Sequence, residues 1–311
     1  MNAIEVDNLS KSYGKVDALK GVSFEVRKGE LFGLIGPDGA GKTTLFRLLT
    51  TLLNPDSGSA KVEGCDIVKD YLSIRSRIGY MPGRFSLYSD LSVEENLNFF
   101  AAIFGVTIEE SYDLVAPIYK HIEPFKNRKA GKLSGGMKQK LALSCALIHR
   151  PSVLFLDEPT TGVDAVSRSE FWDMLSDLKL KGITILVSTP YMDEANRCDR
   201  IALCNEGSIL SIDTPEKIVQ SFDSKLYGVK AKNMFALLES SRKFRGVVNC
   251  YPFGEWHHIV IDKDFDIEAI YSSDLLRAYN TALPHAKLHG LEIIPSKDLR
   301  EIFLGEWESL P

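Results

Sequence analysis

The sequence predicts an α/β domain with a largely parallel β-sheet, followed by a smaller α+β domain. From residue 1 to about residue 222, short apolar runs that suit buried strands alternate with longer helical patterns, which is typical of βα units. After residue 222 this alternation gives way to a different order of elements. A chain of 311 residues is also long enough for two cores, because domains commonly contain ~100 to 200 residues.

The first domain is expected to span residues 1–222. Its clearest strands are the apolar runs at residues 4–6, 21–26, 31–35, 153–156, 183–188 and 200–204. Helical patterns cover residues 93–104, 109–119 and 136–149, and a polar break at 126–132 separates the last two. Because these helices lie between the first and the later strands, we expect a helical subdomain over about residues 88–150.

The second domain is expected to span residues 223–311. Residues 225–232, 235–243, 247–251, 257–261, 267–281 and 291–294 indicate strand, helix, strand, strand, helix and strand, in that order. This order matches the split βαβ, or ferredoxin-like, motif. The cluster of Trp256, His257 and His258 allows either a ligand site or ordinary strand packing.

Composition excludes several classes of function. A formal net charge of −5 argues against a nucleic-acid-binding protein, which would carry a basic excess. The five cysteines are scattered without a Cys-x-x-Cys pair, so reduced thiols in the cytoplasm are expected. No apolar run approaches the ~18 residues needed to span a bilayer, so a membrane role would require a partner.

A glycine-rich loop lies between the apolar run at 31–35 and the helical pattern that begins near Thr44. Its residues are Gly36, Pro37, Asp38, Gly39, Ala40, Gly41, Lys42 and Thr43, with the spacing G-x-x-x-x-G-K-T. Backbone N–H groups in such a loop point at phosphate oxygens, and the following helix presents its positive end to the same anion. Lys42 would neutralise the β- and γ-phosphates of ATP, and the Thr43 hydroxyl would bind Mg²⁺. The other interpretation is a chance glycine turn, and we have no physical account of Asp38 in an anion-binding loop.

Two adjacent carboxylates, Asp157 and Glu158, end the buried strand at 153–156. Alternation along a strand turns neighbouring side chains in opposite directions, so the two can have different roles. Asp157 would hold Mg²⁺ through its water shell, and Glu158 would accept the proton of the attacking water. Alone, this pair would equally suit a solvated acidic turn; the phosphate loop favours the catalytic interpretation.

A second anion-binding helix start occurs at Ser134, Gly135 and Gly136, directly before the pattern at 136–149. One ATP molecule does not need two such helix starts in one chain. The simplest explanation is that this helix start contacts a nucleotide held by another subunit.

Taken together, these motifs resemble the nucleotide-binding domains of ABC transporters, and the resemblance covers residues 1–222. It implies that Tyr13 stacks on adenine, that residues 133–139 are the signature motif, and that the loop ending at Asp164 crosses between paired domains. Asp164 could also cap a helix. Residues 79–82, 131–139 and 191–195 look closest to the exporter branch, which moves drugs, lipids or polysaccharides outward.

Two positions depart from the family pattern. Gly83 stands where the family has a glutamine that reaches Mg²⁺ and the attacking water, and Pro190 stands where it has a histidine that contacts the γ-phosphate. Loss of a positioned polar group in catalysis typically costs ~10² to 10⁴-fold in rate. The chain's own site is therefore expected to hold ATP but to hydrolyse it slowly.

The resemblance implies an ATPase subunit that pairs head to tail with a second nucleotide-binding domain and powers membrane permease subunits from the cytoplasmic face of the membrane. Two alternatives are a soluble ABC-type ATPase acting on ribosomes or DNA and a regulatory module without turnover. The first usually has two such domains or a long coiled coil between the motifs, and only about ninety residues separate Lys42 from Ser134. Gly83 and Pro190 favour the second alternative, whereas Glu158 argues against it.

Overall fold

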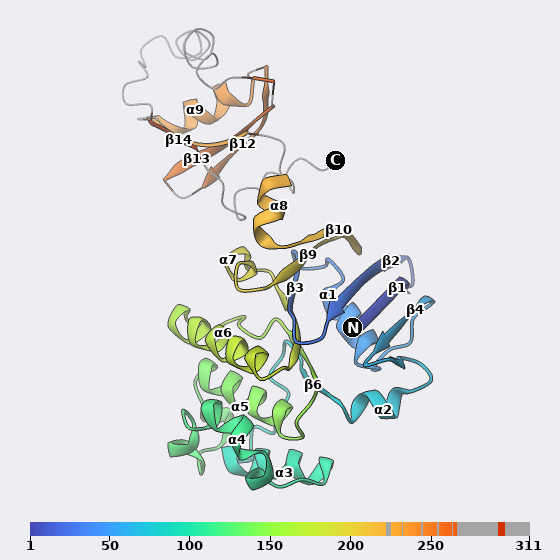
Figure 1. The fold of residues 1–311 in the computed structure, drawn as a ribbon. Helices are drawn as coiled ribbons and strands as arrows, with labels where there is room; N and C mark the ends of the chain where they lie inside the picture. The colour runs from blue at the N-terminus through green and yellow to red at the C-terminus, as the bar shows by residue number, and fades with distance from the viewer. Residues whose placement is uncertain are drawn as a thin grey trace. The chain divides into compact units, whose positions relative to one another are not determined.

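The computed structural model describes residues 1–221, 225–231, 233–243, 245–253, 255–262, 264–265 and 292–295 (Figure 1). The chain divides into two compact units, residues 1–214 and 215–311. This division falls earlier than residue 222, where the change in sequence pattern suggested it.

The first unit contains most of the regular structure. Its strands are β1 Asn2–Tyr13, β2 Val16–Arg27, β3 Leu31–Ile35, β4 Ser57–Val62, β5 Cys65–Asp66, β6 Ile78–Met81, β7 Val153–Asp157, β8 Thr184–Thr189, β9 Arg200–Asn205 and β10 Ser208–Asp213. Its helices are α1 Lys42–Leu49, α2 Tyr71–Arg75, α3 Val93–Phe104, α4 Ile108–Tyr119, α5 Gly135–Leu147, α6 Ala165–Leu180 and α7 Met192–Ala195, with short 3₁₀ turns η1 Glu123–Phe125 and η2 Ala130–Lys132.

The central sheet confirms the predicted α/β class. Its strand order is β10-β9-β3-β8-β7-β6, and every neighbouring pair from β9 to β6 is parallel. All residues of β3, β7 and β8 are buried, as expected for strands covered on both faces. The carboxyl ends of these strands therefore meet at one edge, where the phosphate loop and the two carboxylates follow.

The strands expected at 4–6 and 21–26 do not join that sheet. They belong to β1 and β2, which form an antiparallel hairpin within a second sheet of order β2-β1-β4-β5. The hairpin turns at Gly14 and Lys15, and only antiparallel strands can be connected by so short a turn. Apolar alternation indicates a strand but not which strand it pairs with, so this second sheet was not predicted.

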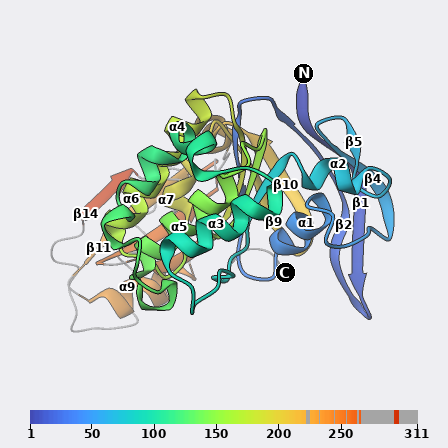
Figure 2. The same ribbon diagram turned by 90° about the horizontal axis from the view of Figure 1, so that it is seen from below.

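Helix α1 packs between the two sheets, because its buried Leu45, Phe46 and Leu49 share one apolar core with residues of both. In the view of Figure 2, α1 lies beside the β1–β2 hairpin. Helix α6 packs on β3 and β8, and α5 packs on β6. The sheet that carries the phosphate loop is thus covered on both faces.

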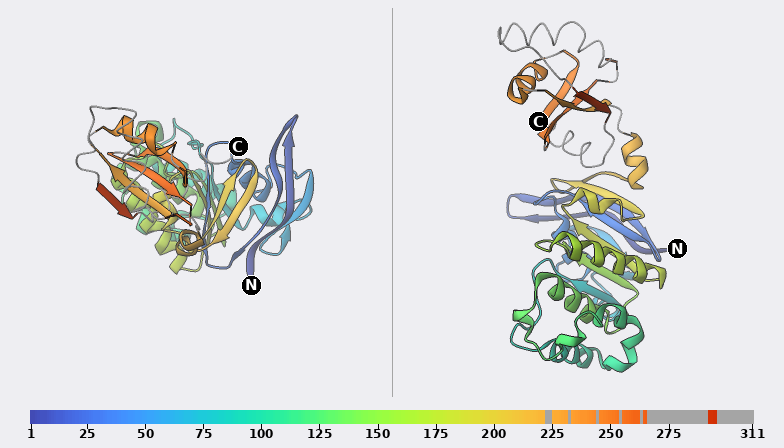
Figure 3. Two further views of the ribbon diagram at one scale, coloured as in Figure 1. Left: turned by 90° about the horizontal axis from the view of Figure 1, so that it is seen from above. Right: turned by 90° about the vertical axis from the view of Figure 1, so that its left-hand side faces the viewer.

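The predicted helical subdomain is confirmed by α3, α4 and α5, which lie between β6 and β7 and pack on one another. Figure 3 shows them grouped at one end of the first unit. Ser92 and Thr107 begin α3 and α4 as capping boxes. Among the residues that the structure describes, no helix is long and apolar enough to cross a membrane.

The second unit begins with α8 Pro215–Ser221, followed by β11 Lys225–Lys230, α9 Met234–Ser241, β12 Val247–Phe253, β13 Trp256–Ile261 and β14 Glu292–Pro295. Its antiparallel sheet has the order β12-β13-β11-β14. His257 and His258 are buried in β13, and His257 Nε2 lies 2.7 Å from the Met234 carbonyl oxygen, so this cluster belongs to strand packing. The helix expected at 267–281 lies outside the described residues, and the ferredoxin-like motif stays a prediction.

Candidate functional site

The loop between β3 and α1 is packed tightly against its surroundings. A Cβ atom on Gly36 would lie 2.2 Å from the Cys204 carbonyl oxygen, and one on Gly41 would lie 2.3 Å from the Ala18 carbonyl oxygen. Gly41, the N-cap of α1, also has a φ of 93°. Any larger residue would collide with backbone at both positions, so the glycine spacing is required by the path of the loop.

The first turn of α1 presents backbone donors to the space in front of the loop. No side chain caps the helix at Gly41, and the first intrahelical hydrogen bond runs from Leu45 N to the Gly41 carbonyl oxygen. The N–H groups of Lys42, Thr43 and Thr44 therefore have no intrahelical acceptor. Together with the helix dipole, these donors form a site that fits a phosphate group.

Lys42 lies beneath the loop with only 3% of its side chain exposed. Its Nζ donates hydrogen bonds of 2.7 Å and 2.8 Å to the carbonyl oxygens of Gly36 and Pro37 and lies 3.4 Å from Glu158 Oε1. A buried ammonium needs such partners, because an uncompensated charge is costly to desolvate. The cation is thus held at the place where the β- and γ-phosphates are expected.

A cavity of about 830 Å³ opens in front of the loop. Tyr13, at the end of β1, lines it with 45% of its surface exposed, and Asp38 is exposed at its edge. Lys15, Lys20 and Glu206 also line the cavity. Sequence reasoning missed these three, because no motif marks them: the β1–β2 hairpin brings Lys15 and Lys20 to the loop, and the turn between β9 and β10 brings Glu206.

Asp157 and Glu158 reach the loop from the end of β7. Asp157 is buried and accepts a 2.7 Å hydrogen bond from the Ser188 hydroxyl, which in turn accepts one of 2.9 Å from Glu158 N. Glu158 has a φ of 49°, a left-handed conformation that costs a residue with a Cβ atom on the order of 1 kcal/mol. Ser188 therefore fixes the Asp157 carboxylate and the Glu158 backbone, a role that a serine near the end of an apolar strand does not reveal in sequence.

The side-chain oxygen atoms near Lys42 are suitable ligands for Mg²⁺. The Thr43 hydroxyl and the Asp157 carboxylate are oxygen ligands, which Mg²⁺ prefers together with water and substrate phosphates. Within the described part of the chain, no group of three His, Cys, Asp or Glu side chains could hold a metal by itself. A Mg²⁺ ion here would accordingly depend on the nucleotide for part of its coordination.

The structure places the second helix start away from the phosphate loop. Ser134 caps α5 by accepting a 3.4 Å hydrogen bond from Met137 N, and neither it nor the two glycines line the phosphate-loop cavity. A Cβ atom on Gly135 would lie 3.5 Å from the Gly162 carbonyl oxygen. The helix start therefore lies beside the loop that ends at Asp164, a proximity that the sequence did not predict.

Asp164 is exposed and caps α6, accepting a 3.0 Å hydrogen bond from Ser167 N. This bond lowers the pKa of the Asp164 carboxyl below its usual value. The helix-capping role inferred from the sequence is confirmed, and it leaves the preceding loop at the surface.

The two positions that depart from the family pattern lie next to the carboxylates. A Cβ atom on Gly83 would be 3.0 Å from the Asp157 carbonyl oxygen, so this backbone packs directly on the end of β7. Pro190 directly follows β8, the neighbour of β7, and offers no N–H donor.

A buried carboxylate fixes the backbone around Pro190. Glu194 accepts hydrogen bonds of 2.8 Å from the Thr160 hydroxyl and 2.5 Å from the Thr189 hydroxyl, and Arg168 Nε lies 3.8 Å away. Tyr191 N donates to the Thr189 hydroxyl at 3.0 Å. These bonds join the segment after β7 to the segment after β8.

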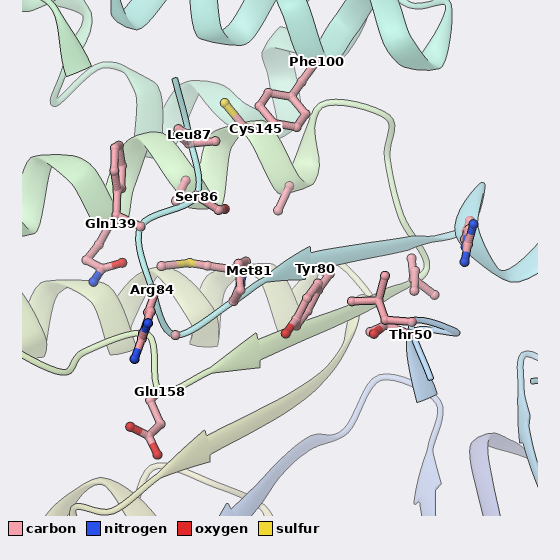
Figure 4. Close-up of a pocket in the computed structure, with 18 of the residues that line it drawn as sticks. Thr50, Tyr80, Met81, Arg84, Ser86, Leu87, Phe100, Gln139, Cys145 and Glu158 are labelled. Atoms are coloured by element: carbon pink, nitrogen blue, oxygen red, sulfur yellow. The ribbon is translucent and has the colours of Figure 1, made fainter. Parts of the chain in front are cut away.

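A second, more apolar cavity of about 360 Å³ is lined in part by the loop after β6 (Figure 4). Met81, Leu87, Phe100 and Cys145 line it, and Glu158 reaches its edge. Burial in this region raises the pKa of Tyr80 to about 12.

Comparison with known proteins identifies relatives for the first unit. Residues 19–161 match the ABC transporter family, and residues 262–311, most of which lie outside the described residues, match the histidine phosphatase superfamily (branch 1). The probable multidrug ABC transporter ATP-binding protein YbhF of Escherichia coli (strain K12) is 45% identical over 228 residues, which is 72% of this chain and 39% of that protein.

A second relative, the Nod factor export ATP-binding protein I of Burkholderia orbicola (strain AU 1054), is 40% identical over 70% of this chain and 73% of its own length. Among solved structures, the ATP-binding subunit of an ABC transporter superposes with a TM-score of 0.65 at 29% identity, over 71% of this chain and 93% of its own. The cbiO1 structure from Clostridium perfringens gives 0.64 at 29% identity, over 71% and 91% of the two chains.

Proposed function

The chain belongs to the ABC transporter family of ATP-binding proteins, and from that premise we propose that it is the ATPase subunit of an exporter-type transporter. The observation that carries this proposal is the phosphate loop, where three free backbone N–H groups and the buried Lys42 converge on one cavity. ATP would place its phosphates against residues 36–44 and its adenine against Tyr13. The names of the multidrug and Nod factor relatives support the exporter assignment.

Hydrolysis would follow from the placement of Glu158. Its carboxylate would accept a proton from a water that attacks the γ-phosphorus, while the bond to the bridging oxygen breaks and ADP leaves. Thr43 and Asp157 would hold Mg²⁺, which neutralises developing phosphate charge when bound. Ser188 keeps Asp157 and the Glu158 backbone in register for this step.

We propose that the working form is a head-to-tail pair of nucleotide-binding domains. Ser134 to Gly136 lie outside the chain's own phosphate cavity, yet they form a helix start, with Ser134 and Gly135 exposed, that would bind a second nucleotide. The adjoining loop at Asp164 would cross to the partner. Because Gly83 and Pro190 impair only the chain's own site, a heterodimer would hydrolyse ATP mainly at the site that borrows Ser134 to Gly136.

The apolar cavity of Figure 4 is the proposed contact with a membrane permease subunit. Exposed aromatic side chains near it, Phe85, Tyr88, Phe99 and Phe104, suit an apolar protein segment. The loop carrying Gly83 connects this surface to the end of β7, so a change at the phosphates could reach the permease. In this proposal the subunit would act from the cytoplasmic face of the membrane.

Calorimetric titration of the purified chain with ATP and Mg²⁺ tests the proposal. Wild type should bind, and Lys42→Ala should show no binding at near-physiological ATP, because the substitution removes the cation that faces the phosphates. Lys28→Ala, which removes an exposed lysine paired with Glu63, is the matched control and should bind as wild type does. Equal affinity of Lys42→Ala and wild type would contradict the assignment.

A second candidate function is a nucleotide-gated module that closes on ATP without turnover. The absence of a polar side chain at both Gly83 and Pro190 favours it. Steady-state phosphate release separates the two: turnover that disappears in Glu158→Gln indicates an ATPase, and binding without any turnover, even beside a competent partner domain, indicates the module.

A further inference from the structure

The loop after β6 contains a cation next to the position that has no side chain. Gly83 packs so closely on β7 that its Cβ position lies 3.0 Å from the Asp157 carbonyl oxygen and 3.8 Å from Glu158 Cβ. The first side chain beyond this contact that can reach the carboxylates is that of Arg84. Residues 83–86 are all exposed, so the Arg84 side chain is free to adjust.

Arg84 points toward Glu158 (Figure 4), and both residues line the same cavity. Over the part of the chain that the structure describes, no hydrogen bond or ion pair is formed by its guanidinium. Other arginines nearby are engaged: Arg75 donates to the Thr51 hydroxyl and carbonyl oxygens, and Arg77 donates to Cys65 Sγ. Arg84 is therefore a cation that forms no ion pair with Glu158 or any other described carboxylate, although it and Glu158 line one cavity.

Glu158 relates this cation to the phosphate loop. Its Oε1 lies 3.4 Å from Lys42 Nζ, and Glu158 lines both the phosphate-loop cavity and the cavity that Arg84 lines. This residue therefore borders both the place where the terminal phosphate is expected and the cavity that contains Arg84. The other cations that line the phosphate-loop cavity outside the loop itself, Lys15 and Lys20, belong to the β1–β2 hairpin. A guanidinium presents two parallel N–H donors, which match two oxygens of one phosphate.

We propose that Arg84 binds the γ-phosphate of ATP and thereby makes this site distinguish ATP from ADP. The inference rests on the proposed function, because it requires the nucleotide to occupy the phosphate loop. Arginine stays protonated at every physiological pH, so Arg84 binds phosphate but transfers no proton. With this arginine, a site that contains Gly83 and Pro190 would hold ATP while hydrolysing it slowly.

The test compares two nucleotides on the full chain. Dissociation constants for ADP and for the β,γ-imido analogue of ATP, each with Mg²⁺, are measured by calorimetry. In Arg84→Ala, the affinity for the analogue should fall roughly 10- to 100-fold, as expected for a lost charge-assisted hydrogen bond, while that for ADP changes less than about twofold. Arg84→Lys should retain part of the preference.

Arg77→Ala is the matched control, since Arg77 lies at the opposite end of β6, and it should leave both affinities unchanged. The inference is overturned if Arg84→Ala leaves the ratio of the two dissociation constants unchanged. This includes an equal loss of affinity for both nucleotides, which would indicate that the loop only supports the site. Faster phosphate release by Arg84→Ala at unchanged affinity also overturns it, because Arg84 would then restrain Glu158. A wild-type chain that binds neither nucleotide would instead refute the proposed function itself.

Discussion

Introducing polar side chains at positions 83 and 190 should raise the rate of ATP hydrolysis at the chain's own site. The double variant Gly83→Gln with Pro190→His adds an amide and an imidazole beside the carboxylates. Pro190 directly follows β8, and Gly83 lies two residues after the end of β6; both strands belong to the central sheet. We expect weak phosphate release from the wild-type chain alone and more from the variant, with little change in ATP affinity.

The structure assigns most of the gain to position 190. Hydrogen bonds that involve Thr189 and Glu194 fix the backbone on both sides of residue 190. A histidine at this position would therefore extend from a rigid backbone. At Gly83, by contrast, the new Cβ atom would lie 3.0 Å from the Asp157 carbonyl oxygen, and strand backbone yields little. One positioned catalytic donor is worth ~10² to 10³-fold in rate. We therefore expect roughly 100-fold from Pro190→His, the lower end of that range, and less than about tenfold more from Gly83→Gln.

The assay is steady-state phosphate release at saturating ATP and Mg²⁺ for wild type, both single variants and the double variant, with dimer formation measured in parallel. Pro190→Ala is the control that removes the ring without adding a donor, and it should not raise turnover. Adding Glu158→Gln to the double variant should abolish the gain.

Robust turnover by wild type that survives Glu158→Gln would show that the catalytic assignment is mistaken. Robust turnover that Glu158→Gln abolishes would mean that the site works without both missing side chains and that the chain acts as a homodimer.

Three further predictions follow from local geometry. Gly36→Ala should lower both the melting temperature and the affinity for ATP, because the alanine Cβ atom would lie 2.2 Å from the Cys204 carbonyl oxygen. Thermal unfolding and calorimetry measure the two effects. A variant with wild-type stability and wild-type ATP affinity would contradict this prediction. A chain ending at residue 222 should fold and bind ATP, because every residue of the proposed nucleotide site lies before residue 222; a folded product that binds no ATP would contradict this prediction. Asp164→Ala should lower the melting temperature at pH 7 by removing the bond from Ser167 N. Folding lowers the pKa of this carboxyl, so the stabilisation is fully present above its ordinary value of 3.8 and is lost as the pH falls through the lower folded pKa. The two melting temperatures should therefore converge in acid.

Sequence reasoning located the parts of the site that depend on local spacing. The phosphate loop was predictable because a strand, two constrained glycines and a helix start are adjacent in the chain, and Asp157 and Glu158 because they end an apolar run. Ser188 was not identified, because its value depends on the pairing of β7 with β8. Contacts between segments distant in sequence, such as Gly135 beside Gly162, likewise require the fold.

The hydrogen bonds around Glu194 bear on what Pro190 has changed. Thr160 and Thr189 both donate to this one buried carboxylate, so the segments after β7 and β8 are joined whether or not residue 190 carries a donor. If the proline had broken these hydrogen bonds, the loop that ends at Asp164 would lose its bond through Thr160. The surface that this loop offers to a partner would then change as well. With the frame intact, the defect at Pro190 is confined to one missing side-chain donor. In the proposed heterodimer, the chain would therefore hydrolyse ATP slowly at its own site and still present Ser134 and its glycines to the nucleotide of the partner.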